Sequence, residues 1–339
     1  MKVHVMTGAA PLRRFQSFAA RTAEAGFDGL VVTEAGRTAF LSCAAAALAD
    51  ADLDLSTGVA VAFPRSPTVT AAVAWELAEA SGGRFRLGLG TQVRAHVERR
   101  YSSTFDAPGP RLREYVLAMR AVFAAFRGAP LSFEGRFYNL SLMNPMWSAG
   151  DIDVPDPPID IAAVNPWMLR MAAEVADGVH IHPLNTPTYF RETVVPNLSR
   201  DGKRMSLFIP TFTVFGDNDE ETARWRDVCR TQVAFYGSTP NYAFIFEQLG
   251  FPDTTPRLRE AQKRGDMAGM TAVISDELLP HFVVEAPWGE AADAVHARLA
   301  PLEQDHDVNV VLYVAGMAAQ AGGDAFERFG EVARDLRGR

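Results

Sequence analysis

Two side chains that can exchange protons stand where predicted strands end, and parallel-sheet enzymes place their chemistry at the carboxyl ends of strands. Glu34 closes an apolar run and shares one face of its strand with Leu30 and Val32. Its carboxylate is either a site residue or a cap for the next helix, and the shared face favours the site. His182 ends a later strand, and an imidazole whose pKa is unperturbed titrates near neutral pH. Glu34 and His182 are therefore the candidates for proton transfer in a catalytic site.

The pair His180 and His182 adds a question about metal binding. A strand places both residues on one face, with Val179 and Ile181 on the other. Two such histidines suggest a site or a metal ion, but no third ligand stands at a suitable spacing, so we expect no metal. His180 is interpreted as a core histidine with satisfied ring nitrogens. His182, one step nearer the mouth, is the functional candidate.

A glycine-rich strand end spans Gly83–Gln92. Gly88 and Gly90 lack a Cβ atom, so a ligand or a neighbouring backbone can approach the strand closely. Thr91 then offers a hydroxyl and an N–H group at the carboxyl end of the strand. The glycine spacing does not match the dinucleotide-binding fingerprint. Packing alone explains the pattern equally well.

Small residues also end the preceding predicted strand, over Thr57–Ala62. A flat ring could lie against the backbone there, and tight packing of the strand on a helix is the equal alternative. Arg65 follows just beyond. Its guanidinium could reach an anion or could simply be solvated.

Two further features could bind an anion. Asn165-Pro166 begins a predicted helix, whose first N–H groups attract negative charge, although every helix begins in this way. A cluster of arginines could neutralise an acidic cofactor tail: Arg94, Arg99, Arg100, Arg111 and Arg113. The alternative is a solvated face on which Glu98 and Glu114 pair with this cluster.

The elements that must position these residues alternate between strands and helices. The eight predicted strands are Lys2–Thr7, Asp28–Glu34, Leu53–Phe63, the stretch around Phe85–Leu89, Ile159–Val164, Gly178–His182, Ser206–Phe215 and Val308–Val314. Because a helix follows each strand, the pattern favours an α/β fold of the (β/α)8 TIM-barrel type over an open sheet. We expect a single barrel domain over residues 1–339, with insertions at about 92–110, 128–158 and 237–286.

Three of these inserted stretches have a local prediction. The segment Gln92–Pro110 is expected to be a polar loop, and Leu131–Leu140 a small hairpin. The segment Asn144–Pro158 is rich in Pro, Asp and Gly and is expected to run over the surface. A further segment, His281–Glu285, is expected to be a short extended piece.

Composition bounds the class of protein. The chain has 339 residues, of which 48% are hydrophobic and 22% charged, as in ordinary globular proteins. A formal net charge of −8 argues against nucleic-acid binding and against a basic membrane-surface protein. Cys43 and Cys229 are interpreted as buried small hydrophobes. No apolar run is long enough to span a bilayer, and we expect a cytoplasmic protein.

A set of short motifs resembles the luciferase-like flavin and deazaflavin oxidoreductases, which are (β/α)8 barrels. The matching motifs occur in the same order as in that family: Gly26–Leu30 leading to Glu34, Thr57-Gly58-Val59 with Pro67 beyond, Gly83–Thr91, and Ala162–Pro166 with Glu174–Gly178. The run Gly90–Arg94 with Arg99-Arg100 downstream is most similar to the branch assigned to coenzyme F420. The resemblance covers nearly the whole chain.

The resemblance implies a position for the cofactor. Its ring would sit at a bulge in the third strand, where a cis peptide bond is expected between Gly58 and Val59. The cofactor-binding residues so implied, together with the candidates above, are Gly58, Val59, Ala60, Thr91, Gln92, Arg94, Ala163, Val164, Asn165, His182 and Asn185. Three positions depart from the family pattern, namely Ala35 in place of a histidine, Gln92 in place of a glycine, and Asn185 where some relatives have a lysine.

The resulting hypothesis is an F420-dependent oxidoreductase that transfers a hydride between C5 of the deazaflavin and a C=C, C=N or C=O group of a small organic substrate. One alternative is a monooxygenase that uses reduced FMN and oxygen, and a second is a barrel that binds a ligand without turnover. Aromatic side chains could line an apolar substrate pocket or belong to the core: Phe63, Trp147, Trp167, Phe235 and Tyr236. A homodimer is expected from the resemblance alone.

Overall fold

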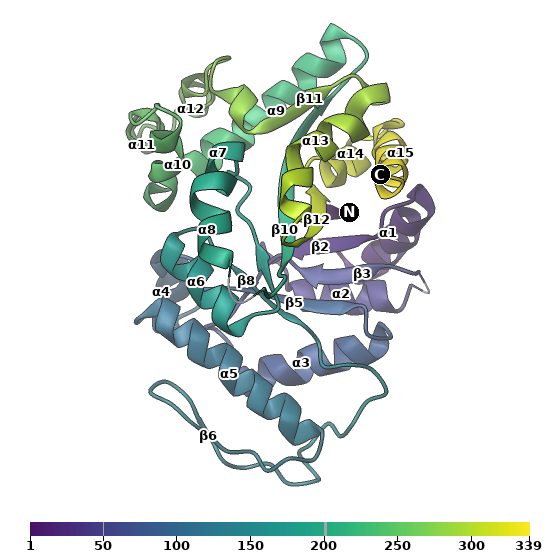
Figure 1. The fold of residues 1–339 in the computed structure, drawn as a ribbon, viewed down its shortest axis with the longest axis vertical. Helices are drawn as coiled ribbons and strands as arrows, with labels where there is room; N and C mark the ends of the chain where they lie inside the picture. The colour runs from purple at the N-terminus through teal and green to yellow at the C-terminus, as the bar shows by residue number, and fades with distance from the viewer. Residues whose placement is uncertain (50, 200–201) are drawn as a thin grey trace.

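The computed structural model describes residues 1–49, 51–199 and 202–339, and a closed barrel of eight parallel strands lies at its centre (Figure 1). In order around the barrel the strands are β1 (Lys2–Gly8), β2 (Gly29–Thr33), β3 (Asp54–Thr57), β5 (Phe85–Gly90), β8 (Ile159–Ala162), β9 (Gly178–His180), β10 (Ser206–Phe215) and β12 (Asp307–Leu312). Pairing of β12 with β1 closes the ring. The predicted (β/α)8 fold is confirmed.

The helices that follow the strands form the outer layer (Figure 1). They are α1 (Leu12–Ala25), α2 (Ala39–Ala47), α3 (Pro67–Ala80), α5 (Pro108–Phe126), α6 (Pro166–Val175), α7 (Pro187–Tyr189) continued through a π-helical turn to α8 (Val195–Leu198), α9 (Asp219–Gly237), α13 (Ala291–Glu303), α14 (Ala315–Ala321) and α15 (Ala325–Arg337). Local signals set several starts. The side chains of Ser66, Asn165 and Asn218 cap α3, α6 and α9 by accepting backbone N–H bonds. None of the described helices is both long and apolar enough to cross a membrane.

The third predicted strand is interrupted. Strand β3 stops at Thr57, the peptide bond between Gly58 and Val59 is cis, and the chain pairs with β5 again as β4 (Ala60–Val61). The cis peptide bond that the resemblance implied is thus confirmed. The side chain of Thr57 connects β3 to β5 at this interruption. Its hydroxyl donates to the carbonyl of Gly88 at 2.7 Å and accepts from the Gly88 N–H at 2.9 Å.

The inserted stretches are more ordered than the sequence analysis predicted. The expected polar loop over residues 92–110 contains a short helix, α4 (Arg94–Arg99), which buries Val97 as its one apolar anchor. One buried residue among charged ones gives no helical periodicity, so the pattern missed it. The predicted hairpin is confirmed as β6 (Phe133–Glu134) paired with β7 (Asn139–Leu140), and it extends beyond α5 in Figure 1.

The long insertion before the last strand carries three helices and one strand. Helices α10 (Ala243–Gln248), α11 (Thr254–Lys263) and α12 (Met267–Val273) gather beyond α7 and α9 (Figure 1). The expected extended piece at His281–Glu285 is a true sheet member, β11 (Val283–Ala286), which pairs in parallel with the outer half of β10. The unusual length of β10, ten residues, lets it pair with the barrel and with β11.

Candidate active site

A cavity of about 400 Å³ opens at the carboxyl ends of the barrel strands. Its lining comes from nearly every strand end and from the insertion before α10: Met6, Thr33, Glu34, Gly58, Val59, Val61, Gly90, Thr91, Gln92, Val93, Ala162, Val164, Asn165, Met168, His180, Ile181, His182, Pro183, Pro210, Tyr236, Asn241 and Tyr242. One side of the cavity is bare backbone and small residues, and polar or aromatic side chains stand on the other sides.

The glycines at this end of the barrel leave no room for a side chain. A Cβ atom on Gly58 would lie 2.1 Å from Val31, and one on Gly88 would lie 2.0 Å from the carbonyl of Thr57. A Cβ on Gly90 would lie 2.7 Å from Val59. Packing therefore requires these glycines. Since Gly58 and Gly90 also line the cavity, the same packing leaves a flat backbone surface that a planar ligand can approach.

The Glu34 carboxylate lines the cavity but is fully engaged. It accepts two hydrogen bonds from Arg65, at 2.5 and 3.0 Å, and one from the Val61 N–H at 2.8 Å. Its side chain is 4% exposed. The alternative role as a helix cap does not apply, because Thr38 precedes α2. Arg65, which the sequence left as either anion-binding or solvated, clamps the Glu34 carboxylate and the Val61 carbonyl instead.

His182 is a partly buried, neutral imidazole. Its Nδ1 accepts a hydrogen bond from the Leu184 N–H at 3.1 Å, and its ring packs on those of Tyr242 and Tyr236, with centroids 3.9 and 5.1 Å away. Burial lowers the pKa of His182 to about 3. The ring therefore carries its single proton on Nε2 at neutral pH, and the sequence-based assumption of an unperturbed pKa does not hold.

Asn185 is turned inward. Its amide nitrogen donates to the carbonyls of His182, Pro183 and Pro210, at 3.0, 3.3 and 2.7 Å, and the side chain is 2% exposed. The amide thereby uses its protons within the turn that follows β9 and ties this turn to β10 through Pro210. The buried Arg298 guanidinium holds the same turn by donating to the Asn185 carbonyl at 3.0 Å. The side chain of Asn185 thus orders the loop that carries His182.

The remaining cofactor candidates separate into three groups. Those that line the cavity are Gly58, Val59, Thr91, Gln92, Val164 and Asn165. Ala60 and Ala163 are buried behind the lining. Arg94 stands on α4 with its side chain 63% exposed and pairs with Glu98 at 2.6 Å.

The arginine cluster is dispersed in the folded chain. Arg111 donates to the Tyr138 hydroxyl and to the Thr104 carbonyl, while Arg113 pairs with Glu174 on α6. Pairing of Glu98 with the cluster is confirmed. The expectation for Glu114 is wrong, because its carboxylate accepts the backbone N–H groups of the hairpin at residues 136–138.

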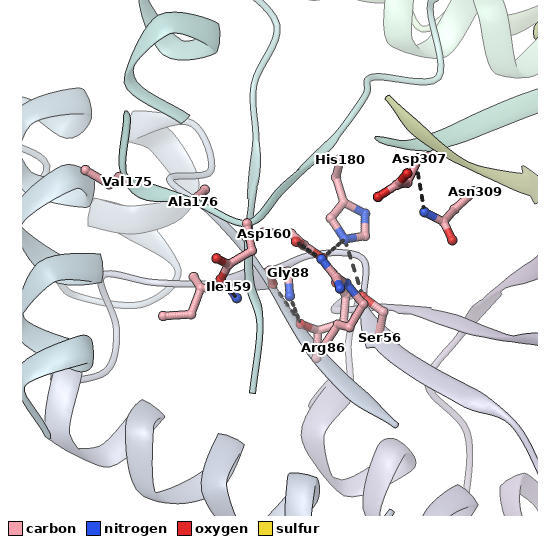
Figure 2. Close-up of polar contacts among 12 residues, drawn as sticks. Ser56, Arg86, Gly88, Ile159, Asp160, Val175, Ala176, His180, Asp307 and Asn309 are labelled. Atoms are coloured by element: carbon pink, nitrogen blue, oxygen red, sulfur yellow. Dashed lines mark hydrogen bonds and ion pairs between the residues drawn. The ribbon is translucent and has the colours of Figure 1, made fainter. Parts of the chain in front are cut away.

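A polar group of Ser56, Arg86, Asp160 and His180 lies inside the barrel (Figure 2), and because its member His180 lines the cavity we call this group the floor. Arg86 on β5 forms two hydrogen bonds to the buried carboxylate of Asp160 on β8, at 2.9 and 2.7 Å. His180 on β9 lies above this pair, with Nε2 4.0 Å from Asp160 and 3.3 Å from the Ser56 hydroxyl. Burial, assisted by the positive charge of Arg86, lowers the pKa of His180 to about 3. Among the described residues no group of three His, Cys, Asp or Glu side chains could hold a metal ion.

Sequence analysis missed several members of the lining. His180 reaches the cavity although it was interpreted as core, and Asn241 and Tyr242 come from the insertion. Strand periodicity did place His180 and His182 on one face. No local signal marks Asn241 or Tyr242, because only the path of the insertion brings them over the barrel.

Comparison with known proteins places this geometry in a family. The model of the family described as luciferase-like monooxygenase matches residues 1–303. An uncharacterized protein of Mycobacterium tuberculosis is 40% identical over 281 residues, 80% of this chain and 83% of its own. A 5,10-methylenetetrahydromethanopterin reductase of Archaeoglobus fulgidus is 28% identical over 240 residues, covering 68% of this chain and 69% of its own.

A solved structure agrees in fold along the whole chain. The coenzyme F420 dependent tetrahydromethanopterin reductase from Methanopyrus kandleri superposes with a TM-score of 0.75 at 18% identity and covers 98% of both chains. Together with the family match over 303 residues, the barrel and its cavity identify the lineage. The chain belongs to the luciferase-like monooxygenase family.

Proposed function

We propose that the protein is an oxidoreductase that uses coenzyme F420 and transfers a hydride between C5 of the deazaflavin and a C=C, C=N or C=O group of a small organic substrate. The observation that carries the proposal is that the backbone surface at Gly58 and Val59 and the neutral imidazole of His182 line the same cavity. The motif run Gly90–Arg94 and the F420-dependent reductase of the same fold support this choice of cofactor.

The residues present fit a planar cofactor with an anionic tail. The ring would lie against Gly58 and Val59, with Ala60 behind them in the strand. Thr91, Gln92, Val164 and Asn165 line the cavity beside the start of α6, where the helix dipole favours negative charge. Ala163 contributes backbone alone. Arg94 lies outside the lining on α4 and would meet only a tail that leaves the cavity.

The chain itself supplies orientation and a hydrogen-bond donor. The reduced cofactor, when bound, supplies the hydride from C5. His182 would present its Nε2–H group to the heteroatom of the substrate and stabilise the negative charge that develops there, as a neutral donor rather than as an imidazolium. Glu34 would act through position, since its carboxylate and Arg65 hold Val61 beside the ring surface.

A flavin monooxygenase is the second candidate function, and the family to which the chain belongs favours it by its description. A reduced FMN ring has the same planar shape and would meet the same surface at Gly58 and Val59. The two candidates differ in their second reactant, an unsaturated organic group in one case and oxygen in the other. The third possibility is ligand binding without turnover.

A binding titration distinguishes the three. Purified protein is titrated with F420 and separately with FMN, and absorbance and fluorescence of the cofactor report binding. Preferential binding of F420 supports the proposal and justifies assays with imines, ketones and activated alkenes under reduced cofactor. Preferential binding of FMN supports the monooxygenase and calls for oxygen-consumption assays. Binding of neither cofactor overturns both catalytic proposals.

A further inference from the structure

The imidazole of His180 occupies an unusual place for a core residue. It stacks on Phe208 with ring centroids 4.7 Å apart and planes at 14°, and it fills the space that Gly88 leaves open. A Cβ atom on Gly88 would lie 2.6 Å from Nε2, and one on Gly58 would lie 3.8 Å from Cε1. The ring therefore sits directly beneath the backbone surface of the cavity, while its side chain stays 6% exposed.

The neighbours of Nε2 determine which ring nitrogen carries the proton. The Ser56 oxygen lies 3.2 Å from the Thr57 carbonyl, which can only accept, and 3.3 Å from Nε2 of His180. With its proton on that carbonyl, the hydroxyl accepts from an Nε2–H group. The Asp160 carboxylate lies on the same side, 4.0 Å from Nε2. Both groups favour a proton on Nε2. A second proton on the ring would face the guanidinium of Arg86, which opposes it.

The other nitrogen, Nδ1, is then an unprotonated acceptor. Nδ1 of His180 has no hydrogen-bond partner among the described residues. Nδ1 of His4 is both unpartnered and fully enclosed, whereas Nδ1 of His180 is not fully enclosed. The small exposed area of the His180 side chain therefore includes Nδ1. Because His180 is part of the cavity lining, that area faces the cavity.

We propose that His180 is a ligand-binding residue whose Nδ1 accepts a hydrogen bond from an N–H group on the edge of the planar ring that lies against Gly58 and Val59. This inference rests on the proposed function, and it goes further by assigning the chemistry of the buried ring edge. An edge with only carbonyl oxygens would meet the lone pair of Nδ1 and be repelled. An N–H edge, such as the imide of a pyrimidine-type ring, complements it.

The first test uses the wild-type protein and needs no variant to fold. Protein labelled with ¹⁵N-histidine is examined by NMR before and after addition of oxidised F420, and then of FMN, while fluorescence shows how much cofactor is bound. The His180 signals are assigned by their loss in His180→Asn. We expect the unprotonated Nδ1 resonance of His180 to move toward the protonated range on saturation, as for a nitrogen that accepts a hydrogen bond. An unchanged Nδ1 resonance at saturation overturns the inference while the proposed function stands.

The second test separates the acceptor from the packing of the ring. His180→Phe keeps a ring on Phe208 and removes the acceptor, and it is expected to raise the Kd of the preferred cofactor about tenfold, the effect of one lost hydrogen bond. His180→Asn places an amide oxygen near the position of Nδ1 and is expected to restore most of the affinity. If Phe and Asn weaken binding equally, Nδ1 has no specific role.

His4→Phe is the matched control. His4 is also a buried imidazole inside the barrel and also packs on Phe208, with ring centroids 5.3 Å apart, but it does not line the cavity. Its replacement is expected to leave Kd within twofold of wild type, and thermal melting shows how each variant folds. An equal loss of affinity in His4→Phe would assign the effect to packing and overturn the inference. Failure of the wild type to bind either cofactor overturns the proposed function, and the inference with it.

Discussion

The floor of the cavity carries His180, and its wall, by which we mean the turn after β9 with the rings packed on it, carries His182. The two imidazoles have the same charge but opposite hydrogen-bonding roles. His180 on the floor and His182 on the wall are two residues apart, and burial lowers the pKa of each to about 3. Ser56 and Asp160 both lie beside Nε2 of His180 and favour a proton there, so Nδ1 is the acceptor that we propose toward the cavity. The Leu184 N–H donates to Nδ1 of His182, which leaves a donor there. Burial fixes the charge of an imidazole, and one neighbouring hydrogen bond determines its role.

The two regions also differ in what holds them. The floor rests on an ion pair between adjacent barrel strands, Arg86 with Asp160. The wall rests on a turn that the amide of Asn185 ties together and joins to β10, with the rings of Tyr236 on α9 and Tyr242 in the insertion packed against His182. Disruption of the floor should therefore act on the stability of the whole barrel. Disruption of the wall should act locally.

Removal of charge from the floor is expected to have the largest effect. Asp160→Asn leaves the guanidinium of Arg86 largely buried without its counter-charge, which should lower the free energy of unfolding by about 3–5 kcal/mol. Urea denaturation followed by circular dichroism measures it. The control is Glu98→Gln, which breaks the exposed pair with Arg94 and should cost at most about 1 kcal/mol. Similar losses in both variants would contradict the role of the floor.

Acid should destabilise both regions through their histidines. In the folded protein each ring stays neutral until about pH 3, whereas the unfolded chain takes up protons near pH 6.5. The unfolded state binds more protons between these values, so this contribution to stability is complete above pH 6.5 and is lost as the pH falls toward 3. Between pH 7 and pH 5 we expect a loss of about 2 kcal/mol per histidine. Urea denaturation at several pH values measures how the free energy of unfolding depends on pH. This dependence should be weaker for His182→Phe than for wild type, and an equal dependence would contradict the neutral ring.

The backbone surface between floor and wall can be tested through Glu34. Glu34→Gln removes the charge that two hydrogen bonds from Arg65 satisfy, and the loss in unfolding free energy should be about 2 kcal/mol. Because the amide of Gln has one acceptor oxygen where the carboxylate has two, Val61 and Arg65 must share it and Val61 is held less firmly beside the ring surface, so turnover should fall while cofactor affinity stays nearly unchanged. Steady-state rates and cofactor titrations separate the two. A fully active variant would remove Glu34 from the mechanism.

Loosening the wall is expected to have the smallest effect on stability. Asn185→Ala deletes the amide that binds two carbonyls of the turn and the Pro210 carbonyl on β10, and the cost should be about 1–2 kcal/mol. The tautomer of His182 should become mixed, because the Leu184 N–H is no longer held against Nδ1. ¹⁵N NMR of labelled histidine detects this, and the signals of His180 should not change. A change at His180 as large as at His182 would contradict the separation of floor and wall.

The fold was predictable because its signals are local. Apolar strands alternate with amphipathic helices along the chain. Each barrel strand pairs with the barrel strands that precede and follow it in the sequence, so chain order determines the ring. The hairpin followed from its turn residues. Helix α4 was missed, since a single buried residue anchors it. The extended piece at His281–Glu285 was predicted without its place in the sheet, because pairing with the distant β10 creates β11.

The candidate site was predictable in position but not in chemistry. Strand periodicity located Glu34, Gly58, Thr91 and His182 at one end of the barrel, and all four line the cavity. Their partners come from elsewhere in the chain. Arg65 engages Glu34, the rings of Tyr236 and Tyr242 pack against His182, and the inward turn of Asn185 uses an amide that the resemblance had assigned to cofactor binding.

The sequence by itself determined the barrel, the end at which its chemistry lies and the family, because these depend on the order of apolar and small residues along the chain. Only the tertiary structure decided which groups carry protons. A pKa and a tautomer depend on burial and on the nearest hydrogen-bond partner, and for His180 those partners, Ser56 and Asp160, lie 124 and 20 residues away on other strands.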